Sequence, residues 1–272
     1  MFIKNTFKYI VQNPRLVLTA LFPALVLGFF ATPSAMVPFL FDYYPSAGNA
    51  LTMRRALVEL LPVRNPFWLF LLVPVTFVFC AAILGLSEHK MRVGNYGFRG
   101  FFQRMNFSVT ALLVPFILVC ALYVIWLFVS ACVLVFIEFI CFKLIGSAAL
   151  SVVFVVIFAV SLLLLLIWII SLLLLWTPVT LVSGYGALDS WYYQLKLLAG
   201  RTFQFAASVA LVFFINGALV TTFGLFLNPY PMIAVNVVCF TFSLIYLIGL
   251  SMTAYFRLSD TPRKDVKKKY YL

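Results

Sequence analysis

Charged side chains are scarce in this chain of 272 residues. Only 10% of its residues are charged and 65% are hydrophobic, whereas a soluble domain carries about 25% charged and 45–50% apolar residues. Such an apolar excess cannot be buried in one core, so it must lie on the outer surface and be covered by lipid. The composition excludes a water-soluble globule, including a soluble nucleic-acid-binding domain, although the formal net charge is +12.

Groups that carry acid–base or metal chemistry are also few. The chain has one histidine, seven Asp and Glu residues and five cysteines. The cysteines lie in or beside apolar runs, with no CxxC pair and no Cys/His spacing typical of a metal site. We therefore expect no metal, no cofactor and no catalytic residues.

Long apolar runs recur along the sequence. A bilayer-spanning helix needs about 20 apolar residues, and a helix satisfies its own backbone hydrogen bonds in lipid. The predicted spans are Leu16–Phe41, Phe67–Leu86, Phe107–Ile137, Leu144–Val182, Phe203–Leu227 and Met232–Phe256. The sequence thus predicts an all-α polytopic membrane protein, a single integral membrane domain with six transmembrane helices.

Two uncharged stretches decide this count. Residues 144–188 contain no turn signal in their middle, so we predict one long span, kinked at Pro178 and broken at 183–186. Residues 202–256 contain two prolines at 228–231, a pattern typical of a turn. The second stretch is therefore predicted to be a helical hairpin.

The basic residues are distributed unevenly about these spans. With six spans, fifteen of the 19 Lys and Arg residues fall on the side of the N-terminus and four on the other. Dividing 144–188 into two spans would remove this bias. Because cytoplasmic loops retain Lys and Arg, we expect both termini in the cytoplasm of a plasma (cell) membrane protein. The first run is expected to be an uncleaved helix rather than a signal peptide.

Three segments on the basic side share an amphipathic pattern before a span. In the first segment, the polar side is Lys4, Lys8 and Gln12 and the apolar side is Ile3, Phe7 and Ile10. In the second, Phe98, Phe101, Phe102 and Met105 lie on one side, and Arg99, Gln103 and Asn106 lie on the other. In the third, Trp191, Leu195 and Leu198 lie opposite Asp189, Lys196 and Gly200. These spacings are helical. They predict interfacial elbow helices and a candidate threefold repeat of units 1–86, 87–182 and 183–256, followed by a basic tail, 257–272. A further short surface helix is predicted in the outer loop 42–66, after Arg54 and Arg55.

The cations of the basic side are candidate contacts for anionic membrane lipids, which attract them electrostatically. The candidates are Lys4, Lys8, Arg92, Arg99, Arg104, Lys196, Arg201, Lys267, Lys268 and Lys269. The alternative is that the bias records only the orientation of insertion.

Two asparagines lie inside predicted spans. Asn216 and Asn236 fall on the two arms of the predicted hairpin. They are expected to hydrogen-bond across the hairpin or, alternatively, to line a substrate site.

A family resemblance accompanies this layout. Segments 186–190 and 197–203, with the elbow-plus-span arrangement, resemble the bacterial integral-membrane family related to YciC and to the membrane region of glycerophosphodiester phosphodiesterases. Segments 88–94 and 104–106 resemble uncharacterised six-span proteins of low-GC Gram-positive bacteria. The resemblance implies a membrane fold and leaves the function open.

Three functions are compatible with these patterns. The favoured one is a non-enzymatic protein that acts through lipid contact or as a partner subunit of other proteins. The alternative is a permease or transporter component for a small apolar or lipidic solute, with a cavity lined by Asn216, Asn236 and 178–186. A membrane-embedded hydrolase would require Glu88, His89 and Asp189 to converge, because catalytic groups must reach one substrate.

Overall fold

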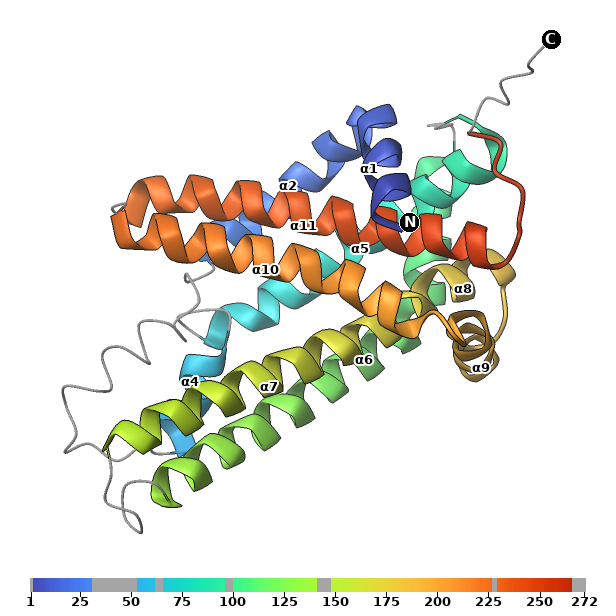
Figure 1. Cartoon of the computed structure of the whole chain (residues 1–272). Helices are drawn as coiled ribbons and strands as arrows, with labels where there is room; N and C mark the ends of the chain where they lie inside the picture. The colour runs from blue at the N-terminus through green and yellow to red at the C-terminus, as the bar shows by residue number, and fades with distance from the viewer. Residues whose placement is uncertain are drawn as a thin grey trace.

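The computed structural model describes residues 2–30, 53–61, 66–95, 100–140, 148–226 and 229–265, and these ranges contain helices and no strand. The helices are α1 (Phe2–Gln12), α2 (Pro14–Phe30), α4 (Met53–Leu60), the short 3-10 helix η1 (Pro66–Trp68), α5 (Leu69–Val93), α6 (Phe101–Glu138), α7 (Ala148–Leu174), α8 (Trp176–Ser183), α9 (Ala187–Leu198), α10 (Thr202–Phe226) and α11 (Pro229–Leu258). Figure 1 shows long helices with the shorter helices α1, α8 and α9 at one end and α4 toward the other.

The predicted all-α polytopic fold is confirmed. Within the described residues, five segments are long and apolar enough to cross a membrane: Leu69–Val93, Phe101–Ile137, Val156–Ser183, Thr202–Gly224 and Tyr230–Leu258. The pair formed by α1 and α2 meets the same criteria together but is bent by 93°, which gives up to six spans. Residues 31–41 of the first predicted span lie outside the described residues.

The fourth span is interrupted where its proline requires it. Pro178 has no N–H to donate to the carbonyl of Leu174, and its ring crowds that carbonyl. Helix α7 ends at Leu174, and α8 begins two residues later. Helix α8 then ends at Gly184, which has a left-handed φ of +69° and donates its N–H to the Thr180 carbonyl over 3.2 Å. The predicted single span, with its kink and its terminal break, is therefore confirmed from residue 148 onward; its predicted start, residues 144–147, lies outside the described residues.

Helices α10 and α11 form the predicted hairpin and lie side by side in Figure 1. The Tyr246 hydroxyl of α11 donates to the Ser208 carbonyl of α10 over 3.1 Å. Tyr246 is fully buried, so this bond satisfies a polar group inside the bundle.

Helix α11 lies at the centre of the bundle, packed against α1, α2, α5, α8, α9 and α10. Of the residues in its most apolar stretch, half are buried inside the bundle, whereas only 11% of the residues in the corresponding stretch of α6 are buried. Large side chains of α6 such as Phe107, Ile117 and Phe128 are more than half exposed. In a membrane these apolar side chains face lipid.

The three amphipathic segments do not fold alike. The first and third are the separate helices α1 and α9, whereas α6 begins at Phe101 and runs on to Glu138, so residues 101–106 are its first turns. Gly200, with φ of +75°, lies between α9 and α10. In Figure 1, α9 is seen nearly end-on whereas α10 runs across the view.

The buried faces of these segments also differ from prediction. Lys4, Lys8 and Gln12 are exposed as expected, but α1 buries Phe2, Thr6 and Tyr9. In α9 the predicted apolar face is divided, because Leu198 is buried and Leu195 is exposed. Tertiary contacts with the bundle, which the helical period does not contain, determine these faces.

The opposite end of the bundle carries α4, the predicted short helix of the outer loop. Ala56 of α4 is buried against Ala131 and Leu134 of α6. Nearby in the chain, the Trp68 ring of η1 contacts the Phe30 ring at the end of α2, with centroids 4.3 Å apart.

The close approach of α2 to α11 yields a stability prediction. A Cβ at Gly28 would lie 2.9 Å from the backbone nitrogen of Val237, whereas a Cβ at Gly217 would meet nothing within 4 Å. Gly28→Ala should lower the free energy of unfolding by about 1–3 kcal/mol, because the backbone must shift. Gly217→Ala, the matched control, should be neutral or stabilise by up to about 1 kcal/mol. Equilibrium unfolding in mixed detergent–SDS micelles measures both; equal values would contradict this packing.

Candidate functional site

Contacts far apart in sequence bring α1 to the place where α10 begins and α11 ends. The rings of Phe2 and Phe205 meet edge-to-face with centroids 5.8 Å apart. The hydroxyl oxygens of Thr6 and Thr253 lie 3.3 Å apart, within hydrogen-bonding distance, and both residues are buried. The first helix and the end of the last helix therefore lie at the same end of the bundle.

The chain after α11 continues to the end of α5. The backbone N–H of Lys264 donates to the Met91 carbonyl over 2.9 Å. Gly94, with φ of +93°, caps α5, and a Cβ there would lie 3.3 Å from the Lys264 carbonyl oxygen. The Lys90 ammonium donates to the Gly94 carbonyl over 2.9 Å. These bonds fix the segment after α11 against α5.

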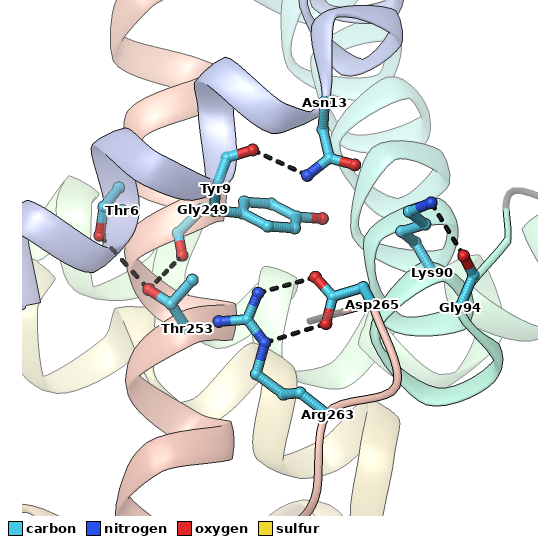
Figure 2. A network of polar contacts seen from close by, with 9 residues as sticks. All are labelled: Thr6, Tyr9, Asn13, Lys90, Gly94, Gly249, Thr253, Arg263 and Asp265. Carbon is cyan, nitrogen blue, oxygen red and sulfur yellow. Dashed lines mark hydrogen bonds and ion pairs between the residues drawn. The ribbon is translucent and has the colours of Figure 1, made fainter. Parts of the chain in front are cut away.

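A partly buried ion pair closes the same region, as Figure 2 shows. Arg263 donates two hydrogen bonds to the Asp265 carboxylate, of 3.1 and 2.7 Å. The Asp265 side chain is only 3% exposed. The Arg263 guanidinium carbon lies 5.5 Å from the centroid of the Tyr9 ring. The pair and the ring form a clasp that joins the segment after α11 to α1.

Charged side chains also join the adjacent ends of α5 and α6. Arg92 bonds Glu88 over 2.7 Å within α5. Between the two helices, a terminal guanidinium nitrogen of Arg104 lies 2.9 Å from Nε2 of His89. Because arginine has no acceptor, His89 accepts this bond with an unprotonated Nε2.

Helix α9 is attached to this end through α8. The Trp176 indole N–H donates to the Ala187 carbonyl over 2.9 Å, and the Trp176 and Trp191 rings have centroids 5.2 Å apart. On its inner side, Gln194 is fully buried and neither of its amide atoms has a hydrogen-bond partner in the described part of the chain.

These elements place most of the predicted lipid contacts at one end, which we call the basic end. The side chains of Lys4, Lys8, Arg92, Lys196 and Arg201 are exposed there, and Arg104 is half-buried beside His89. Arg99, Lys267, Lys268 and Lys269 lie outside the described residues. The structure therefore brings together every candidate that it describes.

The intramembrane asparagines do not pair with each other as one of the two hypotheses expected. Asn216 of α10 donates through its amide to the Ser243 hydroxyl of α11, which itself donates to the Cys239 carbonyl. Asn236 is buried nearer the start of α11. The predicted polar bond across the hairpin exists, but the partner of Asn216 is a serine seven residues, or about two helical turns, beyond Asn236.

The residues considered for hydrolysis have other surroundings. Glu88 is held by Arg92 and His89 by Arg104, while Asp189 lies on the exposed side of α9. Among the described residues no group of three or more His, Cys, Asp or Glu side chains could hold a metal ion.

Comparison of the chain with protein-family models, with curated proteins and with solved structures gives no match. The resemblance to the YciC-related family therefore stays a prediction. The case for a function rests on the geometry of the basic end.

The sequence did not indicate the clasp or the buried glutamine. Arg263 and Asp265 are two residues apart in a basic segment, where an ion pair gives no periodic signal, and Tyr9 reaches them only through the folding of α1 onto α11. Gln194 lies three residues after Trp191 and four before Leu198, at the edge of the predicted apolar face, and a polar side chain there gives no sign that it is buried.

Removal of the Asp265 charge tests the clasp. Asp265→Asn leaves the Arg263 guanidinium, 19% exposed, without its carboxylate, so the free energy of unfolding should fall by about 1–3 kcal/mol. The control is Asp260→Asn, an exposed position with φ of +51°, which asparagine adopts readily. Thermal unfolding in detergent should show a lower midpoint only for Asp265→Asn; equal midpoints would show that the pair contributes nothing.

Proposed function

We propose that this protein is a non-enzymatic multi-pass membrane protein that binds anionic lipids of the cytoplasmic leaflet through its basic end. The observation that supports this most directly is the convergence of exposed cations from α1, α5, α9 and the link between α9 and α10 at one end of the bundle. Helix α1 contributes Lys4 and Lys8, which project from the side opposite its buried residues.

The energetics favour lipid headgroups as the ligands of these cations. A Lys or Arg near an anionic bilayer surface contributes about 1 kcal/mol of attraction. Several cations at one depth therefore add to a substantial preference for anionic over zwitterionic lipid. Long basic side chains reach headgroups while their methylene stems stay beside apolar surface, an arrangement that suits helices lying across the ends of the spans.

The proposal also includes the orientation of the chain in the membrane. Helix α1 and the end of α11 share one end of the bundle, and this end carries most of the basic residues. Because Lys and Arg are retained on the cytoplasmic side, we place both termini in the cytoplasm and the protein in the plasma membrane, as the resemblance to a bacterial membrane family also favours.

The lipid preference can be measured on the detergent-solubilised full-length protein. Phosphatidylglycerol should raise the unfolding midpoint by at least about 4 °C more than phosphatidylcholine, because a ligand of the folded state stabilises it. Lys4→Gln combined with Lys8→Gln should reduce this difference by about half, given about 1 kcal/mol for each cation.

The matched control carries the same number of charge removals at the opposite end. Arg54→Gln with Arg55→Gln, both in α4, should leave the difference between the two lipids unchanged. Equal stabilisation by phosphatidylglycerol and phosphatidylcholine in the unaltered protein would refute anionic-lipid binding.

The orientation has an independent test. Epitope tags at both ends of the chain should resist protease in intact right-side-out spheroplasts and be digested in inverted vesicles. A tag inserted between Asp42 and Ala50, in the opposite loop, should show the reverse pattern. Digestion of the terminal tags in intact spheroplasts would overturn the cytoplasmic assignment.

A further inference from the structure

Helix α9 buries two polar residues on its inner side and exposes large apolar residues, beside Asp189 and Lys196, on its outer side. Its inner side consists of Ser190, Gln194 and Leu198, which are 0, 0 and 1% exposed. Its outer side presents Leu188 and Tyr192, 72 and 69% exposed, together with Leu195. The two sides each follow a helical spacing, so the arrangement is a property of the whole helix.

In water this orientation would be unfavourable. A fully buried carboxamide without hydrogen-bond partners loses its hydration without compensation, and Gln194 is in that situation within the described part of the chain. The exposed leucines and tyrosine would gain from burial. The same side also exposes the charged Asp189 and Lys196, a mixture that an acyl-chain boundary beside lipid headgroups accommodates. The observed orientation therefore indicates that the surroundings of the outer face are apolar.

The connections of α9 identify those surroundings. Three residues, 184–186, join it to α8 at the end of one span, and three more, 199–201, join it to α10 at the start of the next. The helix is therefore held at the depth where two spans end. One residue into α10, the Phe203 side chain is 86% exposed on a helix that crosses the membrane.

Charge on the outer side is consistent with a lipid boundary. Lys196, four residues after Tyr192, and Arg201, just beyond the helix, are both exposed. Tyrosine is enriched at the membrane interface, with its ring among the acyl chains and its hydroxyl among headgroups. A leucine–tyrosine face flanked by cations is the composition of a helix lying in the interface.

We propose that the outer face of α9, formed by Leu188, Tyr192 and Leu195, is inserted into the acyl-chain boundary of the leaflet at the basic end. Its occupant is bilayer lipid. This proposal rests on the part of the proposed function that places the basic end at a membrane surface. It does not depend on the charge of the lipid headgroups, so we expect the same contact in zwitterionic lipid.

A photocrosslinking amino acid tests the occupant. The full-length protein with p-benzoylphenylalanine in place of Tyr192 is reconstituted in phosphatidylcholine nanodiscs, irradiated and analysed by intact-protein mass spectrometry. We expect a phospholipid adduct in a yield at least about fivefold above that at Pro262, an exposed position beyond α11, because interfacial helices contact acyl chains continuously. The same substitution at Ile117, on the exposed side of α6, is the positive control.

The outcomes separate the alternatives. A yield at Tyr192 equal to that at Pro262 means that water covers α9 and overturns the proposal. Irradiation in native membranes tests the remaining occupant, because an adduct to another protein at Tyr192 would make this face a partner surface instead. If the Tyr192 variant does not fold, the substitution at Leu188 is judged by the same criteria. Phosphatidylcholine carries no net charge, so a lipid adduct at Tyr192 does not depend on the preference for anionic lipid. If that adduct forms while phosphatidylglycerol and phosphatidylcholine stabilise the protein equally, only the proposed binding of anionic lipid is refuted.

Discussion

The contact of α1 with α11 near Gly249 organises the basic end. A Cβ at Gly249 would lie 3.4 Å from the Thr6 side chain and 3.5 Å from the Tyr9 ring, so the two helices approach closely there. This approach brings Thr6 to Thr253 and Tyr9 to Arg263. Because α2 turns from α1 by 93°, the same contact lets Lys4 and Lys8 lie across the end of the bundle while α2 runs along α11. Without it, the cations of α1 would have no fixed position relative to Arg92 of α5 and to Arg201, which precedes α10.

Local chemistry accounts for what the sequence predicts well. The absence of charge over long runs predicts membrane spans, since no other structure buries so many apolar side chains. Pro178 acts on a carbonyl four residues away, and the prolines at 229 and 231 act within one turn, so the break in the fourth span and the hairpin are predictable from a few neighbouring residues. The uneven distribution of Lys and Arg is a sum over many loops, so it can be predicted without knowing how the helices pack against one another.

Contacts between distant segments account for the rest. The helical period identified an amphipathic α1, but the partner helix determined that Tyr9 rather than Ile10 is fully buried. Asn216 bonds Ser243 instead of Asn236 because the register of α10 against α11 places the serine opposite it. In α9 the sequence pattern grouped Leu195 with Leu198, whereas packing on α8 and α11 separates them. Which side of such a helix is buried depends on the neighbouring helices and on whether water or lipid covers the rest.

The central position of α11 has a consequence for biosynthesis. The hydroxyls of Thr6 and Thr253 that meet in the finished bundle are separated by 247 positions in the chain. At a translation rate of about 5–20 residues per second, α1 and α2 leave the ribosome about 12–50 seconds before the helix that they pack against. During that interval the Gly28 surface of α2 and the side of α1 that carries Thr6 and Tyr9 lack α11, the helix against which they pack. The translocon, a chaperone or lipid must shelter them until the last helix arrives.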